Sequence, residues 1–212
     1  MRRRSLPRSF YARPTLEVAR DLIGKVLVHE TSAGRAAGVI VETEAYIGED
    51  DPACHAAPGP TARNAPLYGP PGIAYVYLNY GIHYLVNAVT EPEGHPAAVL
   101  IRALAPVEGH ALMRRRRARG TGRPAAALTD DELCRGPGNL TRALGIDLRH
   151  NLEDLTAASL RIEGDHGPRS AFGAQVPRVE WTPRIGITRG AERLWRCSVV
   201  GHPAVSGRRV RR

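Results

Sequence analysis

The residues best placed to do chemistry in this chain are a carboxylate and a group of aromatic rings. Glu44 lies near the end of a predicted strand over 39–46, and a carboxylate acting as a general base typically speeds a reaction by about 10²–10⁴-fold. Side chains alternate along a strand, so Glu42, Glu44 and Tyr46 share one face and the residues between them can enter the core. A general base must stay ionised, and Arg102, on another predicted strand, is a candidate for the nearby cation. A half-buried strand with a solvated acidic face is the commoner explanation of the same pattern.

Aromatic residues make up only 5% of the chain, yet four tyrosines, at positions 75, 77, 80 and 84, fall within ten residues. Tyrosines pack well in strands, and this structural role explains most such clusters. Tyr80 does not fit it, because it stands beside Gly81 at a predicted turn, where a large ring is exposed without packing. An exposed ring at a hairpin tip suits a wedge that enters a base stack and fills the space of an extruded nucleotide. Tyr75 and Tyr77 share one strand face, so at least one of them can line a pocket.

A metal site is the competing interpretation of the acidic strand and the loop after it. The spacing of the available ligands fits no standard zinc motif, and the neighbouring Cys54 and His55 are poorly placed to hold one ion together. The His-x-Glu and Pro-Cys-x-x-Cys pattern of zinc deaminases is also absent. The sequence therefore predicts no metal and no other cofactor, although these groups were weighed as ligands: Glu42, Glu44, Asp50, Asp51, Cys54 and His55.

The composition points to a polyanionic partner. The 212 residues carry a formal net charge of +9, which favours nucleic acid without proving it. Of the 30 basic residues only Lys25 is lysine, and an arginine cannot supply the neutral amine that Schiff-base catalysis needs. Three widely spaced cysteines favour free thiols in a reducing cytosol. No apolar run is long enough for a membrane span, and no hydrophobic stretch follows the arginines at the start, so neither a membrane anchor nor a secretory signal is expected.

The elements that must position these residues are short and mixed. We expect an α+β fold in a single domain over 1–212, with a mostly antiparallel β-sheet core, flanking short helices and a protruding β-hairpin. The termini, 1–9 and 206–212, are expected to be flexible. The predicted strands are 25–30, 39–46, 97–103, 160–163, 184–188 and 194–200, with the hairpin formed by 74–78 and 82–89. Four helices are predicted: one after an N-cap at 15, one over 107–119, one that begins at a capping box at 129–132, and one over 139–144. Residues 47–73 are expected to form a long loop and residues 120–127 a connector.

Spaced motifs run along nearly the whole chain: Glu42 to Tyr46, His55, Thr61, Arg63-Asn64, Pro71-Gly72, Tyr75 to Tyr77, Tyr80-Gly81, Asn87, Leu100 to Ala103, Leu133 to Leu140 and Arg184 to Ile187. In this order they resemble one known family, that of alkyladenine (3-methyladenine) DNA glycosylases. The resemblance implies an enzyme that flips alkylated or deaminated purines out of duplex DNA and hydrolyses the N-glycosidic bond. It also implies that no metal is used and that the DNA backbone is not cut.

The resemblance assigns a catalytic and a base-binding group. Glu44 would activate the attacking water, which Arg102 and the main-chain carbonyl of Ile185 would help to hold. The flipped base would be held and read by a second set of residues. Tyr46, His55 and Tyr77 would stack on it, main-chain groups near Ala53 and His55 would read its edge, and Asn87 would exclude the amino group of normal guanine.

A third group would contact the DNA. Tyr80 would be the intercalating wedge, and Arg63, Gly138 and Asn139 would contact the backbone. Gly138 ends a Gly-Pro-Gly turn before a predicted helix, where main-chain N–H groups can bind a phosphate. Asn139 stands where some relatives carry a basic residue.

The expected protein is therefore a monomeric, monofunctional glycosylase without lyase activity, which acts on damaged purines in double-stranded DNA. Its expected location is the cytoplasm of a bacterial-type cell, at the nucleoid. Two other classes remain open. A non-catalytic nucleic-acid-binding module would need only the arginines and tyrosines, and a metal-dependent hydrolase would lose its activity to a chelator.

Overall fold

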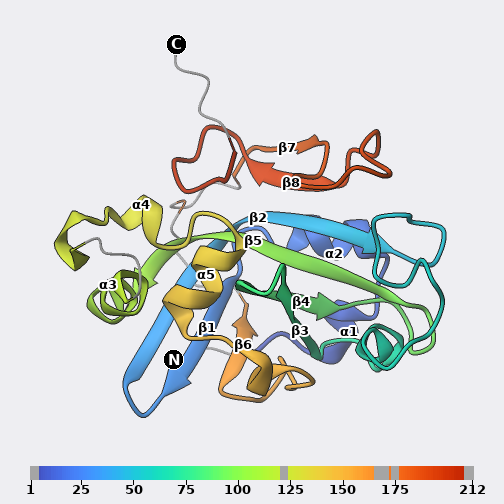
Figure 1. Ribbon diagram of the computed structural model, residues 1–212, viewed down its shortest axis with the longest axis horizontal. Helices are drawn as coiled ribbons and strands as arrows, with labels where there is room; N and C mark the ends of the chain where they lie inside the picture. The colour runs from blue at the N-terminus through green and yellow to red at the C-terminus, as the bar shows by residue number, and fades with distance from the viewer. Residues whose placement is uncertain (1–4, 120–123, 165–171, 173–176, 208–212) are drawn as a thin grey trace.

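The computed structural model describes residues 5–119, 124–164, 172 and 177–207, and it forms a single α+β domain around one antiparallel sheet (Figure 1). The expected fold class is confirmed. The connector residues 120–123 and most of both basic termini lie outside the described residues. Within the described part of the chain, no helix is long and apolar enough to cross a membrane.

The strand that carries the acidic residues organises the sheet. β2 (Gly34–Ile47) pairs along one edge with β5 (Ala97–Glu108). Its other edge changes partner, because the first half pairs with β1 (Val26–Thr31) and the second half with β8 (Arg196–Val199). Register irregularities in the β2–β5 pairing, between Ile40 and Thr43, fall at this change of partner. β2 is thus covered on both edges where Glu42 and Glu44 lie.

The remaining strands extend the sheet outwards. β4 (His83–Val89) continues from β5, and β3 (Ala74–Asn79) forms the outer edge beside it. On the other side β6 (Leu160–Glu163) pairs with β1, and β7 (Val179–Thr182) pairs with β8. In Figure 1, β7 and β8 lie above the rest of the sheet.

Short helices cover the sheet. α1 (Arg8–Tyr11) and α2 (Thr15–Asp21) lie behind it in Figure 1, and α5 (Pro137–Leu144) lies in front. α3 (His110–Ala118) and α4 (Asp130–Leu133) lie beside α5. Three short 3₁₀ turns complete the elements of the described residues: η1 (Ala65–Tyr68), η2 (Ala125–Ala127) and η3 (Leu148–His150).

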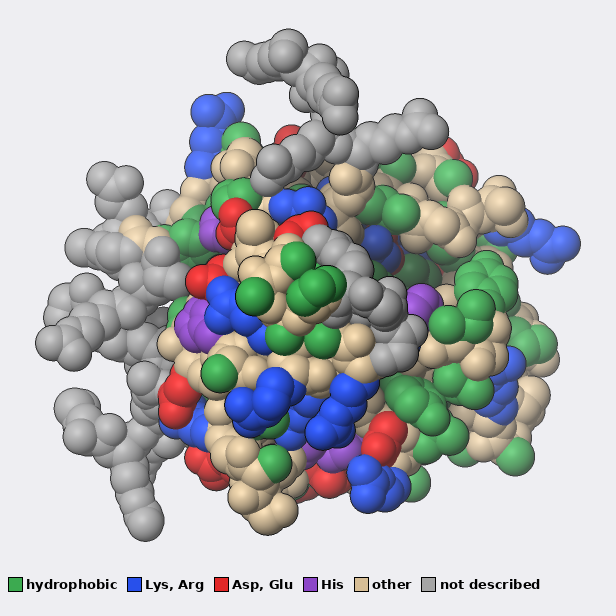
Figure 2. All heavy atoms as spheres, turned by 60° about the vertical axis from the view of Figure 1, so that its left-hand side comes forward, with side chains coloured by type: hydrophobic (Ala, Val, Ile, Leu, Met, Phe, Trp, Pro, Cys, Tyr) green, Lys and Arg blue, Asp and Glu red, His purple; other side chains and the backbone are tan. Residues whose placement is uncertain are grey.

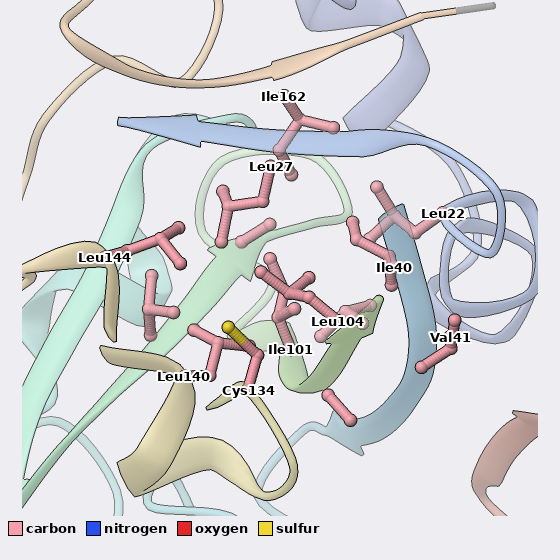
Figure 3. Close-up of a cluster of buried hydrophobic side chains, with 14 of the residues drawn as sticks. Leu22, Leu27, Ile40, Val41, Ile101, Leu104, Cys134, Leu140, Leu144 and Ile162 are labelled. Atoms are coloured by element: carbon pink, nitrogen blue, oxygen red, sulfur yellow. The ribbon is translucent and has the colours of Figure 1, made fainter. Parts of the chain in front are cut away.

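The core lies between the sheet and these helices. Fully buried aliphatic side chains from the strands meet those of α5, and Figure 3 shows Leu104 and Ile101 of β5 next to Leu140. Apolar burial of this kind contributes roughly 25 cal/mol per Å² of area removed from water, which makes it the main source of stability. The core therefore fixes β5 and β2 relative to each other, and with them the residues that those strands present.

Several predicted boundaries differ from the observed ones. β2 and β5 are longer than expected, and residues 107–108, predicted as the start of a helix, end β5 instead. Residues 184–188 form no strand, because the strand that pairs with β8 is at 179–182. Thr15 does not cap α2. Its hydroxyl donates to Glu91, at 2.7 Å, and Pro14 occupies the N-cap position.

Two residues in the termini expected to be flexible are held by the domain. Leu6 is buried, and its N–H donates to the Ile162 carbonyl at 2.8 Å. Ser206 donates to the buried Glu42 from both its N–H and its hydroxyl, each at 2.8 Å. Residues 1–4 and 208–212 lie outside the described residues.

The predicted hairpin is present, with Tyr80 at its tip. The Ile82 N–H donates to the Asn79 carbonyl at 3.0 Å, and φ is +49° at Tyr80 and +69° at Gly81. Positive φ at both central residues is the geometry of a type I′ turn, which matches the twist of the strands but strains a bulky residue. The Tyr80 side chain is 85% exposed, so no packing compensates for this strain. A strained and exposed aromatic residue indicates a role outside the fold.

Candidate active site

Glu44 is fully buried, and its carboxylate is held by three donors. Oε2 accepts hydrogen bonds from the Tyr46 hydroxyl at 2.9 Å and from Nη1 of Arg102 at 3.0 Å. Oε1 accepts from the backbone N–H of Ile185 at 2.7 Å. The expected cation, Arg102, is therefore beside Glu44. The alternative of a solvated acidic face is wrong, because Glu42 and Glu44 both have an exposed fraction of 0%.

The hydrogen bonds leave Glu44 one place for a further donor. An ionised carboxylate has about four lone-pair sites. Three are filled by the donors above, so Oε1 can accept one more hydrogen bond. Burial raises the pKa of Glu44, while Arg102, the Ile185 amide and the Tyr46 hydroxyl oppose this shift. A raised pKa brings a carboxyl group nearer to the value that suits a general base.

A cavity of about 330 Å³ lies next to this carboxylate, at the lower end of the roughly 300–1,000 Å³ that is usual for small-molecule sites. Glu44 is not part of its wall, but the three residues that bind Glu44 all are: Tyr46, Arg102 and Ile185. The wall also contains the other residues expected to bind a base, namely Ala53, His55, Tyr77 and Asn87, together with Tyr75.

Three of the rings in the wall, those of His55, Tyr75 and Tyr77, pack against one another. His55 and Tyr77 have ring centroids 4.5 Å apart, and Tyr75 and Tyr77 are stacked at 5.3 Å with an interplanar angle of 29°. Nδ1 of His55 and the Tyr75 hydroxyl are 2.8 Å apart. Burial lowers the pKa of His55, and the charge of Arg63 lowers it further. A neutral imidazole therefore faces the cavity near neutral pH.

Asn87 and Ala53 are fixed by their own contacts. Asn87 is buried, and its side-chain amide donates to the Tyr75 carbonyl at 3.0 Å. The N–H of Ala53 donates to the buried Asp51 at 3.2 Å. Both residues thus meet the cavity from positions that the surrounding chain determines.

A buried ion pair beneath the aromatic wall was not predicted from the sequence. Arg184 binds Asp51 through two hydrogen bonds of 2.6 and 2.8 Å, and both side chains have no exposed surface. The Arg184 guanidinium also lies 4.6 Å from the Tyr46 ring centroid and 5.0 Å from that of Trp195. It covers one face of Tyr46 and leaves the other for the cavity. The two residues of the pair are 133 positions apart, so no local pattern predicts the contact. The sequence indicated Arg184 only as the first residue of the motif that continues to Ile187.

Tyr80 lies at the entrance to the cavity. It lines the cavity together with Asn79, although its ring is mostly exposed. Pro137, at the start of α5, also lines this cavity. The exposed ring and the buried carboxylate therefore belong to one site.

The three residues expected at the DNA backbone are more dispersed. Arg63 lines two neighbouring hollows rather than the aromatic cavity, and its guanidinium lies 6.0 Å from the Tyr77 ring. Gly138 lines another hollow on the far side of the hairpin. Asn139 uses its side-chain amide to bind the Arg135 carbonyl at 2.7 Å. The structure does not gather these three, and their DNA contacts stay predictions.

The lysine lies away from the aromatic cavity, whereas two of the residues weighed as metal ligands, Cys54 and His55, line it. Lys25 lines a hollow shared with Phe10 and Val179 and not the aromatic cavity. Among the described residues, no group of three or more His, Cys, Asp and Glu side chains is arranged to hold a metal ion. All three cysteines are buried free thiols.

The site thus consists of a buried, arginine-bound carboxylate beside a cavity lined by aromatic rings, within an α+β domain. The family model described as Methylpurine-DNA glycosylase (MPG) matches residues 9–203. The chain belongs to this family.

Relatives from several organisms match over almost their whole length. A protein of Methanocella arvoryzae is 48% identical over 206 residues, which covers 96% of each chain. One of Rubrobacter xylanophilus is 49% identical over 199 residues, covering 91% of this chain and 95% of its own. One of Chlorobium phaeobacteroides is 45% identical over 208 residues, covering 97% and 96%. All three bear the name "Putative 3-methyladenine DNA glycosylase".

Proposed function

We propose that this protein is a monofunctional DNA glycosylase that removes alkylated or deaminated purines from double-stranded DNA. One observation carries the proposal: the Glu44 carboxylate, held by Arg102, lies directly behind the wall of a cavity lined by aromatic rings. The family match and the names of the relatives support DNA as the substrate and a damaged purine as the base removed. The protein would act as a monomer at the nucleoid, without a cofactor.

The first step is base extrusion. Moving a nucleotide out of the stack costs a few kcal/mol, less for a damaged or mispaired base, and stacking on an aromatic side chain returns roughly 1–3 kcal/mol per base. Tyr46, His55 and Tyr77 supply the rings, while Tyr80 fills the gap that the base leaves in the duplex. A cationic alkylated purine gains about 0.5–2 kcal/mol more from electron-rich rings.

The second step is hydrolysis. A water donates to Oε1 of Glu44, which takes its proton as the oxygen attacks C1′ of the sugar. The bond from C1′ to the base breaks, and its electrons leave with the base. Arg102 and the Ile185 carbonyl help to hold the water. Because Glu44 has no exposed surface, this step requires the part of the wall formed by Tyr46, Arg102 and Ile185 to admit the water.

The leaving base sets the limits of this chemistry. An N-alkylated purine departs as a neutral molecule and needs no acid. A neutral lesion such as hypoxanthine needs a proton, and the lowered pKa of His55 makes the imidazole a poor donor. Asn87 excludes the amino group of guanine, and main-chain groups near Ala53 and His55 read the edge of the base.

The position of Lys25 supports a reaction that stops at the abasic site. A lyase step requires an amine that attacks C1′. Lys25 lines a different hollow from the aromatic cavity, so its side chain is not offered to the sugar. The product is then an abasic site in an intact strand.

The test is a set of duplexes, each with one lesion: 3-methyladenine, 7-methylguanine or hypoxanthine. Purified protein should release the free base from at least the cationic lesions, and the strand should break only after alkali. Release of no base from any duplex, with tight binding retained, would favour a non-catalytic binding module. Strand breakage before alkali would contradict the monofunctional mechanism, and loss of activity on chelation would favour a metal-dependent hydrolase.

A further inference from the structure

A second hollow, of about 760 Å³, lies across the β3–β4 hairpin from the aromatic cavity. Asn79 and Tyr80 line the aromatic cavity, whereas residues 82–84 line the second hollow. The start of α5 is shared in the same way, since Pro137 lines the first and Gly138 the second. The hairpin tip and the start of α5 therefore form a ridge between the two hollows. We call the second hollow the basic groove, after its arginines: Arg116, Arg119, Arg142 and Arg149.

The ridge is fixed by direct contacts. A Cβ added to Gly138 would lie 2.6 Å from Cγ of His83, so the histidine ring lies directly against the helix backbone. The Thr141 hydroxyl donates to the Tyr84 carbonyl at 2.7 Å. Because α5 holds the base of the hairpin, the basic groove has a set position relative to Tyr80.

The charges of the basic groove are only partly balanced. Arg149 is bound to Asp147 at 2.8 Å, and the acidic Glu30 is bound by Arg161 at 2.9 Å. Arg119 and Arg142 have no carboxylate partner among the described residues. Figure 2 brings forward the side of the molecule on which α3 lies in Figure 1, and it shows Lys and Arg side chains gathered below the centre of that face.

Like charges are crowded at this place. Arg116 is held by the Leu144 carbonyl at 2.6 Å, and burial, followed by the charges of Arg119 and Arg115, lowers its pKa. Repulsion within such a cluster costs the fold stability, and a polyanion in the groove would relieve it. Guanidinium groups suit phosphate in particular, because their N–H donors match two phosphate oxygens at once.

We propose that the basic groove binds the phosphate backbone of the duplex that flanks the extruded nucleotide, with Arg119 and Arg142 as the contacts. The inference rests on the proposed function, because it takes Tyr80 as the wedge in the duplex. A duplex split by that ring must continue past the ridge on both sides, and the groove lies on the side away from the aromatic cavity. The groove is thus placed to hold DNA that the aromatic cavity does not touch.

The experiment is the double variant Arg119→Gln/Arg142→Gln, bound to a duplex with a stable abasic-site analogue over a range of salt concentrations. Each phosphate contact contributes about 0.9 to the slope of log K against log salt, so the double variant should lower the slope by about 1.8. The single-turnover rate of base release at saturating protein should equal that of the wild type. The midpoint of thermal unfolding should not fall, because repulsion has been removed. An unchanged slope would overturn the proposal.

Two controls locate the contact. Arg115→Gln removes an arginine of α3, the helix that ends just before Arg119, and this arginine does not line the groove, so the slope should stay near the wild-type value. A duplex shortened on the side of the lesion that lies in the basic groove should bind more weakly, and its binding should become insensitive to the double variant. A duplex shortened on the opposite side of the lesion should keep its sensitivity to the double variant. Equal sensitivity on both shortened duplexes would show a general charge effect and reject the groove. Failure of the wild type to release any base would instead reject the proposed function.

Discussion

Glu42 and Glu44 stand two residues apart on β2, have no exposed surface and share Arg102, yet their surroundings differ. Glu42 accepts four hydrogen bonds: from Arg102 at 3.0 Å, from Arg196 at 2.7 Å and from the N–H and hydroxyl of Ser206 at 2.8 Å. Glu44 accepts three, one of them from a tyrosine that lines the aromatic cavity.

The comparison separates a structural carboxylate from one that can react. Burial and contact with an arginine are common to both, so neither property identifies the base. What differs is where the donors lie: of the residues that bind Glu42 only Arg102 lines the aromatic cavity, whereas all three residues that bind Glu44 line it. Glu42 ties β2, β5, β8 and the segment at Ser206 together, whereas Glu44 faces the wall of the cavity.

The largest expected effect comes from Glu44→Gln. The variant loses the proposed base, so the single-turnover rate of base release should fall by about 10²–10⁴-fold or more. The amide also loses the bond to the Ile185 N–H, but it no longer bears the cost of a buried charge. Arg102 keeps Glu42 as a carboxylate partner, so the variant should still fold, with a smaller loss of stability than a change at Glu42 causes, and binding to a damaged duplex should stay near normal, as measured by thermal unfolding and equilibrium binding. Base release at the wild-type rate would show that Glu44 is not the base.

The matched control, Glu42→Gln, should have the opposite effect: a large loss of stability and a small loss of the rate of base release. Breaking a buried ion pair while its partners stay buried typically costs about 3–5 kcal/mol. Here Arg102 and Arg196 would both lose an anion, so the free energy of unfolding in denaturant should fall by an amount of this order. Well below the unfolding midpoint, base release should fall far less than in Glu44→Gln. Equal losses of rate in the two variants would mean that the two carboxylates act as one unit.

The sequence could predict the local half of this site. Alternation along β2 placed Glu42, Glu44 and Tyr46 on one face, and the turn beside Gly81 placed Tyr80 at a hairpin tip. Both follow from rules that act over a few residues. Arg102 was a candidate because another strand was expected, and the pairing of β2 with β5 brings it to Glu44.

The long-range half could not be predicted. Ser206 reaches Glu42 across 164 positions, and Asp51 meets Arg184 across 133. Which acid receives which arginine depends on β2 changing partner from β1 to β8, and no local pattern encodes that exchange. The predicted C-terminal boundary of β5 was wrong for a similar reason. Pairing with β2 extends the strand over residues whose own pattern favoured a helix.

Tyr46→Phe gives the smallest and most specific effect, a shift in the pH dependence. The Tyr46 hydroxyl donates to Oε2 of Glu44 and lowers its pKa, against the larger effect of burial, which raises it. Only ionised Glu44 can take a proton, so the rate falls as the pH drops through this pKa. Removal of the hydroxyl raises the pKa of Glu44, so the acidic limb of the rate profile should move to higher pH. The plateau should change little because the ring remains.

Tyr77→Phe is the control, since it removes a hydroxyl from the same cavity without removing a bond to Glu44. The acidic limb of its rate profile should therefore stay in place. If the acidic limb moves to lower pH in Tyr46→Phe, or moves equally in both variants, a group other than Glu44 controls the rate. The proposal that Glu44 reacts while Glu42 is structural would then be wrong.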